Sequence, residues 1–175
     1  SNFLTVKDHS VSGEDFQLLI HEKLDMLETF PQPEENQLSK YYKSEDYISH
    51  TDTKRNLLER IYHFVRSVSL KRKIKLINSF QLTGKKILDI GCGTGDFLAS
   101  AKKDGWEITG IEPDDNARLI ANKKTNNAVF NIDYLTKFEQ SQYDVISLWH
   151  VLEHLPDLDN QISILRKLLK PTGIL

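Results

Sequence analysis

The stretch from Ile87 to Leu98 constrains the fold of this chain more than any other part of the sequence. It opens with a short apolar run over residues 87–90, the pattern of a strand buried on both faces of a parallel sheet. Glycines follow at positions 91, 93 and 95, and a helical pattern of apolar residues begins at Phe97. Because glycine has no Cβ, the backbone of such a turn can pass close to a ligand, and the following helix presents free N–H groups. The stretch therefore predicts a buried strand, a ligand-binding turn and a helix.

Two classes of cofactor bind at a turn of this kind, and its spacing and charge favour one of them. Dinucleotide sites favour the order G-x-G-x-x-G, with the pyrophosphate at the helix N-terminus. This chain has the spacing G-x-G-x-G, and Asp96 stands where the last glycine would be. Asp89 is expected at the carboxyl end of the strand, where ligands of open α/β sheets bind. Two carboxylates beside the turn suit a cation better than a pyrophosphate, so we expect a sulfonium cofactor.

Residues 88–95, Leu-Asp-Ile-Gly-Cys-Gly-Thr-Gly, resemble the first motif of the class I S-adenosylmethionine (SAM)-dependent methyltransferases. The resemblance implies a doubly wound, Rossmann-like α/β fold with a mostly parallel sheet, preceded by an N-terminal arm and a helix. It implies an enzyme that transfers the SAM methyl group to an oxygen, nitrogen or carbon of a small-molecule acceptor. In this motif the expected cofactor-binding residues are Asp89, Gly91, Cys92, Gly93 and Gly95. The alternatives are a SAM-binding module without activity and, disfavoured by the glycine spacing, a nicotinamide-dependent oxidoreductase.

Acidic residues after the next two strands are the candidates for holding the rest of the cofactor. Glu112 lies 21 residues after Gly91, the distance at which a strand–helix–strand unit brings an acid beside a bound ribose. Its carboxylate can accept hydrogen bonds from both ribose hydroxyls. Glu112 and Pro113 also match the second motif of the family. The resemblance further implies that Asp133 meets the adenine amino group and that Tyr134 packs on the ring.

The remaining pattern alternates between strands and helices. We expect strands at 106–111, 128–132 and 143–148, and helices at 53–80, 97–103, 114–123 and 158–170, the last ended by Pro171 and Gly173. The family's sheet is usually ordered 3-2-1-4-5-7-6, so we expect a sheet truncated after its fourth strand, with residue 174 beginning a fifth. The chain is then a fragment of a longer protein, or its sheet is completed by self-association through the open edge. We expect such a chain to bind the cofactor and to turn over poorly.

Residues 149–156, Trp-His-Val-Leu-Glu-His-Leu-Pro, resemble the V-L-E-H-L signature of the ubiquinone-biosynthesis O-methyltransferase-like branch. Trp149 is expected to contact the cofactor. His150, Glu153 and His154 have i, i+3, i+4 spacing, so on a helical turn they would share one face beside the transferred methyl group. Three roles stay open for them: a base for the acceptor, ligands of a transition metal, or structural bonds that fix the turn. We name them as the catalytic candidates and expect no bound metal.

The chain is expected to divide into an N-terminal arm, residues 1–52, and a methyltransferase domain, residues 53–175. Residues 1–13 are polar, and we expect them to be loosely held. The arm also holds a segment rich in tyrosine and histidine, and in related methyltransferases a segment at this place folds over the cofactor. Aromatic side chains that stack and hydrogen-bond can close a pocket in this way. The candidate lid residues are Tyr42, Tyr47 and His50, whose alternative role is to pin the arm onto the domain.

Residues 16–30 of the arm fit either a helix or a hairpin of two short strands. Residues 16–47 resemble the N-terminal part of a bacterial methyltransferase group in which a zinc ribbon precedes a Pro-x-Pro segment and a Tyr-Tyr pair. In that group the ribbon carries a C-x-x-C between two strands. Here His21 and Leu24 stand at the matching positions, so the ligand pair is gone. The resemblance therefore favours a metal-free hairpin over the helix.

Composition narrows the classes of partner and the compartment. The net charge of −2 over 175 residues gives no general reason to expect nucleic acid as a partner. Locally, eight Lys or Arg residues and one acid lie between Lys54 and Lys75, a face that attracts an acidic partner or is simply solvated. A single cysteine excludes an internal disulfide and fits a reducing compartment. With no long apolar run and no signal-peptide pattern, we expect a cytoplasmic protein without membrane contact.

Overall fold

The computed structural model describes residues 2–9, 11–22, 24–32, 57–155 and 157–175, and the side chains of the first helix from residue 64 onward. It divides the chain into two compact units, residues 1–55 and 56–175. The boundary expected between residues 52 and 53 lies outside the described residues.

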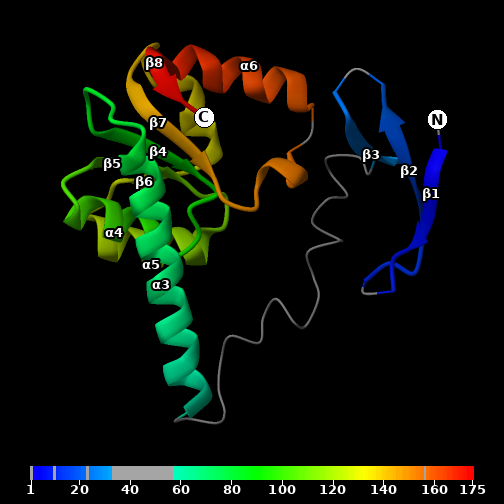
Figure 1. Cartoon of the computed structure of the whole chain (residues 1–175), viewed down its shortest axis with the longest axis horizontal. Helices are drawn as coiled ribbons and strands as arrows, with labels where there is room; N and C mark the ends of the chain where they lie inside the picture. Colours follow the sequence, from blue (N-terminus) through cyan, green and yellow to red (C-terminus); the bar gives the residue numbers. More distant parts are fainter. Residues whose placement is uncertain (1, 10, 23, 33–56, 156) are drawn as a thin grey trace. The chain divides into compact units, whose positions relative to one another are not determined.

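The smaller unit is an antiparallel sheet of three strands in the order β1-β2-β3 (Figure 1). Its strands are β1 (Asn2–Lys7), β2 (Asp15–His21) and β3 (Met26–Phe30). The hairpin expected over residues 16–30 is confirmed, with His21 paired opposite Met26 at its closed end. The imidazole of His21 lies 3.8 Å from the Glu28 carboxylate, and Leu24 is an exposed residue of the turn.

The expectation that residues 1–13 are loosely held is wrong for the first of these strands. β1 pairs with β2 along its length, and Val6 lies opposite Phe16. The connecting turn is fixed by Asp8, whose carboxylate accepts hydrogen bonds from the N–H groups of Val11 (3.2 Å) and Ser12 (2.8 Å). An aspartate that accepts from backbone N–H groups three and four residues later stabilises a turn locally.

The larger unit is a parallel sheet of five strands in the order β6-β5-β4-β7-β8. Its strands are β4 (Lys86–Ile90), β5 (Glu107–Ile111), β6 (Val129–Phe130), β7 (Tyr143–Leu148) and β8 (Leu169–Ile174). Its α-helices are α3 (Leu57–Ser79), α4 (Asp96–Lys103), α5 (Asp115–Thr125) and α6 (Leu158–Leu168). Strands and helices alternate along the chain, as expected for a parallel sheet.

Helices cover both faces of this sheet, because alternate residues of its central strand point to opposite layers. Ile87 of β4 packs with Ile77 of α3 and Phe97 of α4 on one face. The next residue, Leu88, packs with Leu165 of α6 on the other. The expected α/β class with a doubly wound parallel sheet is therefore confirmed.

The sheet differs from the expectation at both edges. β8 is a strand of six residues that begins directly after α6, so the fifth strand of the described sheet starts at residue 169 and not at residue 174. Pro171 lies within β8, where its missing N–H is tolerated because the register with β7 is irregular. At the other edge, β6 is shorter than the expected strand at 128–132. Asn131 accepts the N–H of Ile132 and starts a 3-10 helix, η2 (Ile132–Lys137), which ends the strand early.

Two expectations about partners concern the surface of the larger unit. Among the described residues, no helix is both long enough and apolar enough to cross a bilayer. Self-association through an open sheet edge stays a prediction, and β8, which borders only β7 in the described sheet, is now the edge that it concerns.

Candidate functional site

The glycine turn lies at the carboxyl ends of β4 and β5 and is bound to the end of β5. The N–H groups of Gly91 and Cys92 both donate to the carbonyl oxygen of Ile111, at 2.8 and 3.1 Å. Gly95 then closes a tight turn by donating to the Cys92 carbonyl oxygen at 3.0 Å. Gly91, Gly93 and Gly95 all have positive φ angles, of 66°, 54° and 75°. The backbone thus turns sharply over the sheet edge before α4 begins.

Glu112 is the residue that ties this turn to the next helix. Its side chain is buried, with 8% of the residue exposed. One carboxylate oxygen accepts the N–H of Gly93 at 2.7 Å, and the other accepts the N–H of Asp114 at 3.0 Å. Asp114 in turn caps α5 by accepting the N–H of Ala117 at 2.7 Å. Because a carboxylate oxygen can accept more than one hydrogen bond, both oxygens of Glu112 keep capacity for a ligand.

Asp89 is an almost fully buried carboxyl group near the carboxyl end of the central strand β4, 2% exposed. The Ser147 hydroxyl on the neighbouring strand β7 donates to it at 2.6 Å. Burial raises the pKa of Asp89 from its ordinary 3.8 to about 7, and the negative charge of Glu112 acts in the same direction. The Ser147 hydrogen bond and the Lys73 ammonium oppose this rise. Asp89 is therefore a carboxyl group whose charge near neutral pH depends on what lies beside it.

Lys73 and Trp149 form an aromatic and cationic layer on the same face as Asp89. The Lys73 ammonium lies 4.2 Å from the centroid of the Trp149 ring, which meets Phe97 edge-on at 5.5 Å. Burial lowers the pKa of Lys73, and the charge of Asp89 partly offsets this. The indole Nε1 of Trp149 is enclosed and has no acceptor among the described residues. The expected cofactor residue Trp149 thus lies close to the glycine turn, with an unused donor.

The only cysteine, Cys92, lies within the turn and is partly buried. Burial raises the pKa of its thiol, and the carboxylates of Asp89 and Glu112 raise it further. A thiol held neutral in this way is a poor nucleophile. Cys92 therefore serves the turn through its backbone N–H group.

The candidate adenine-binding residues lie at the start of η2. Asp133 is exposed, in the first turn of this short helix. The Tyr134 ring stacks on Phe130, with centroids 4.3 Å apart and planes inclined by 14°. Pro113, the residue after Glu112, is exposed and its carbonyl oxygen accepts a hydrogen bond from Arg118.

The catalytic candidates gather around one carboxylate, although not on one helical face. Only residues 152–154 form a helical turn, η3 (Leu152–His154), and His150 precedes it with a φ of 60°. The expected shared face is therefore wrong, because a left-handed residue turns the chain before the helix begins. His150 Nδ1 and His154 Nε2 each lie 4.0 Å from a Glu153 oxygen. The side chain of His150 is 90% exposed, that of His154 49% and that of Glu153 55%.

The metal and lid expectations concern different parts of the chain. Among the described residues, no group of three or more His, Cys, Asp or Glu side chains is arranged to hold a metal ion. The candidate lid residues Tyr42, Tyr47 and His50 lie outside the described residues.

Three residues of this region were missed in the sequence. Ser147 and Lys73 face Asp89 from β7 and α3, and Arg118 donates to the carbonyl oxygens of Glu112 (2.7 Å) and Pro113 (3.0 Å). Arg118 carried a local signal, since it lies about one turn into the helix that follows an acidic strand end. Ser147 could be found only by aligning β7 with β4, in the register that sets Asp89 beside it.

Comparison with known proteins finds a matching family and several relatives. A family model described as a methyltransferase domain matches residues 62–175. The ubiquinone biosynthesis O-methyltransferase of Pasteurella multocida is 36% identical over 110 residues, which cover 54% of this chain and 46% of the relative. That of Actinobacillus pleuropneumoniae is 36% identical over 105 residues, which cover 54% and 45%. The chain thus spans about half the length of these curated relatives.

Solved structures resemble the larger unit in fold. A SAM-dependent methyltransferase from Archaeoglobus fulgidus has a TM-score of 0.54 and 27% identity, covering 62% of this chain and 51% of that one. A SAM-dependent methyltransferase from Corynebacterium glutamicum has a TM-score of 0.50 and 20% identity, covering 68% and 73%, and shows the same fold. The family model covers more than half of the sequence, and the chain belongs to the methyltransferase domain family.

Proposed function

We propose that this chain is the cofactor-binding part of a SAM-dependent methyltransferase that acts on a small-molecule acceptor. The observation that carries the proposal is the Glu112 carboxylate, which lies at the end of β5 and accepts the N–H of Gly93 at 2.7 Å. A ligand seated on the glycine turn would meet this carboxylate directly. The O-methyltransferase names of the similar relatives support an oxygen as the acceptor atom.

The residues present fit SAM, which is a cation with a nucleoside and an amino acid end. Buried carboxyl groups stand at two places beside the turn, Asp89 and Glu112. The enclosed Trp149 Nε1 offers a donor that no described residue uses. A pyrophosphate would meet two negative groups at the same place, so a nicotinamide dinucleotide fits less well.

In the mechanism that we infer, the chain binds and orients more than it reacts. SAM supplies a methyl group already activated by its positively charged sulfur. Glu112 would accept hydrogen bonds from the ribose hydroxyls, Asp133 would accept one from the adenine amino group, and Asp89 would supply negative charge for the cationic end. Holding two reactants in line can supply about 7–11 kcal/mol of the barrier, so orientation is the main contribution.

The catalytic part of the proposal concerns the cluster around Glu153. His150 Nδ1 or His154 Nε2 would accept the proton of the acceptor hydroxyl, and Glu153, 4.0 Å from both, would stabilise the imidazolium that results. No metal ion takes part in this scheme. A SAM-binding module without activity is the second candidate, because these three side chains are about half exposed or more.

Two further elements of the proposal concern the surroundings of the protein. We infer a reducing, cytoplasmic compartment, which the single partly buried thiol of Cys92 supports. A small-molecule acceptor and not nucleic acid is supported by the net charge of −2.

The test is a calorimetric titration of the chain with SAM, with S-adenosylhomocysteine and with NAD. We expect both sulfur compounds to bind and NAD to give no heat. NAD is the matched control, because it shares the adenosine part and differs in its charged remainder. The proposal would be overturned if NAD bound while SAM and S-adenosylhomocysteine gave no heat of binding.

A further inference from the structure

A groove runs between α3 and α4, and neither Asp89 nor Glu112 lines it. It has a volume of about 690 Å³, within the range of roughly 300–1,000 Å³ that small-molecule sites occupy. Helical spacing explains its walls: positions 66, 67, 70, 71 and 74 share one face of α3, and positions 96, 100, 103 and 104 line the facing side of α4. Lys124 of α5 also lines it.

Both acids of the groove are already engaged by partners of the chain. Asp96 pairs with Arg66 and with Lys124, the latter at 2.8 Å, and accepts the Thr94 hydroxyl at 2.8 Å. Although partial burial raises the pKa of Asp96, these partners outweigh it and the pKa is lowered. Asp104 accepts the Asn78 amide at 2.8 Å.

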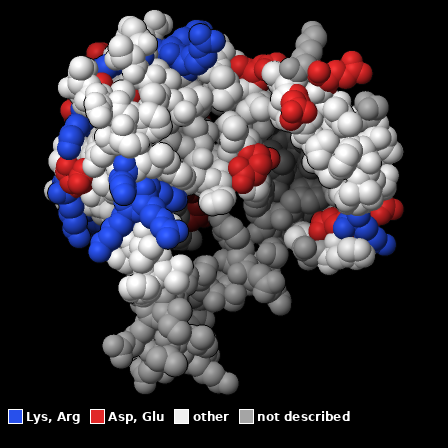
Figure 2. Space-filling model, in the orientation of Figure 1, with Lys and Arg blue, Asp and Glu red and all other residues white. Residues whose placement is uncertain are grey.

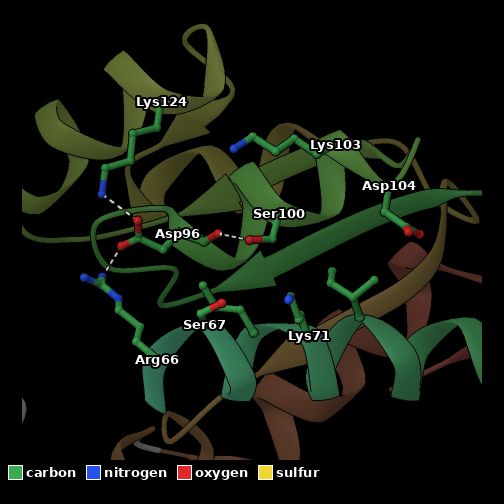
Figure 3. A pocket seen from close by; sticks show the side chains of 10 residues that line it. Arg66, Ser67, Lys71, Asp96, Ser100, Lys103, Asp104 and Lys124 are labelled. Carbon is green, nitrogen blue, oxygen red and sulfur yellow. Dashed lines mark hydrogen bonds and ion pairs between the residues drawn. The ribbon is translucent and has the colours of Figure 1, made fainter. Parts of the chain in front are cut away.

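Two lysines in the groove have no such partner. Lys71 of α3 and Lys103 of α4 form no ion pair with a described residue, and Figure 3 shows them on opposite helices, with the hydroxyl of Ser67 nearby on α3. Figure 2 shows Lys and Arg side chains gathered on the side of the larger unit where α3 and α4 lie. The basic stretch between Lys54 and Lys75 therefore includes one lysine, Lys71, that lines the groove and forms no ion pair with a described residue.

The floor of the same groove is apolar. Leu70 and Ile74 are partly buried and pack on the core beneath α3. A ligand that satisfied the whole groove would therefore carry a negative group for the lysines and an apolar part for the floor. A dianionic phosphate suits two ammonium groups and a hydroxyl better than a single carboxylate does.

We propose that this groove is a second ligand site, which binds a small organic phosphate. Its phosphate group is held by Lys71, Lys103 and the Ser67 hydroxyl, and its apolar part lies on Leu70 and Ile74. The clamp of Arg66 and Lys124 on Asp96 keeps the two helices and α5 in place around it. Because Asp96 directly follows Gly95, the occupied groove would adjoin the glycine turn without using Asp89 or Glu112.

Phenyl phosphate is the probe, followed by the amide NMR shifts of Ser67 and Ser100 during titration. We expect it to bind more tightly than phenol or inorganic phosphate, since each lacks half of the ligand. The double variant K71Q/K103Q should weaken binding about tenfold, the loss of charge-assisted hydrogen bonds to the phosphate. The matched control K75Q/K123Q removes two exposed lysines outside the groove and should bind like the parent.

Three outcomes would overturn the site. Equal weakening in both double variants would mean general attraction to positive charge. Equal affinity for phenol or for inorganic phosphate would remove one half of the proposed ligand. Displacement of phenyl phosphate by excess SAM would place the phosphate at the glycine turn, whereas continued binding beside SAM supports a separate groove.

Discussion

At the scale of single residues, the Glu112 carboxylate has two tasks that a substitution can separate. It holds Gly93 and Asp114 through their N–H groups, and it is proposed to hold the ribose. Glu112→Ala should weaken SAM binding by about 1.5–3 kcal/mol, the range for hydrogen bonds to a charged group. Calorimetry on variant and parent measures this difference directly.

Glu107→Ala is the control for Glu112, because it removes an acid from the other end of the same strand. The Glu107 side chain is 70% exposed and pairs with Lys86 at 3.1 Å. Its loss should leave SAM affinity unchanged. An unaltered affinity in Glu112→Ala would remove Glu112 from the site.

Asp89 makes a prediction about pH. In the unfolded chain this carboxyl loses its proton near 3.8, whereas in the folded protein it keeps the proton until about pH 7. Its contribution to stability is therefore complete below about pH 4 and is lost as the pH rises toward 7, by about 1.4 kcal/mol per pH unit at most. Relative to Asp89→Asn, which stays neutral, the parent should lose free energy of unfolding across this window in urea titrations.

The same carboxyl group gives SAM binding a pH dependence of opposite direction. A cation favours the ionised form of Asp89, so SAM affinity should rise with pH through about 7. Asp89→Asn should flatten that rise. A parent protein whose SAM affinity is constant between pH 6 and 8 would contradict the placement of a cation beside Asp89.

At the scale of elements, two glycines of one turn differ in what surrounds them. A Cβ at Gly95 would lie 2.9 Å from the Ala121 Cβ and 3.0 Å from its Cα, whereas a Cβ at Gly93 would meet nothing within 4 Å. Gly93→Ala should therefore cost only the left-handed backbone, about 1–2 kcal/mol. Gly95→Ala should cost about 1–3 kcal/mol more, because α4 and α5 must move apart.

Denaturant unfolding of the two alanine variants tests this difference, with Gly93→Ala as the internal control for backbone strain. If both variants lost the same free energy of unfolding, α5 would move away from the methyl group added at position 95 without an energetic cost. Both variants change the turn, so SAM affinity measured in parallel separates loss of fold from loss of site.

The elements themselves were largely predictable where local and tertiary signals coincide. β4, α4, β5 and β7 are apolar runs bounded by glycine or acid, and their buried faces match their periodicity. The boundary between α6 and β8 was not predictable, because the helical spacing of apolar residues continues into residue 169. Residues 169 and 170 form a strand only because β8 pairs with β7, which lies far away in the sequence.

The glycine turn of the candidate site was predictable from the sequence. The residues that contact its carboxyl groups were less predictable. Glu112 follows from chain distance, because one strand–helix–strand unit has a nearly fixed length. Ser147 lies 58 residues from Asp89, so only the strand register brings the two together. The i, i+3, i+4 argument for His150 assumed a continuous helix, and one residue with a φ of 60° removed that assumption.

At the scale of the whole molecule, the role proposed for the cluster around Glu153 can be tested in a protein extended to the length of the curated relatives. If the cluster supplies the base, His154→Ala in that protein should lower turnover while SAM affinity stays nearly unchanged. His9→Ala, in an exposed turn of the smaller unit, is the control. We expect a chelator to have no effect on activity.

Other outcomes separate the remaining roles of the cluster. A reversible loss of activity on chelation, restored by a divalent transition ion, would establish the metal role. A variant that melts earlier and keeps its turnover per folded molecule would assign His154 to the structure of the turn.

The parallel pairing of the larger sheet has a consequence for synthesis on the ribosome. No two neighbouring strands of this sheet can meet through a tight turn, since each pair needs an intervening helix. β4 can pair with β5 once residue 111 has emerged, but its other edge waits for residues 143–148. During that interval one edge of the central strand β4 has no pairing strand, and Asp89 lacks the hydrogen bond from Ser147. The protease resistance of stalled chains should therefore rise in a second step, when β7 has been synthesised. A pause of translation between these two points would thus prolong the stage at which the chain most needs a chaperone.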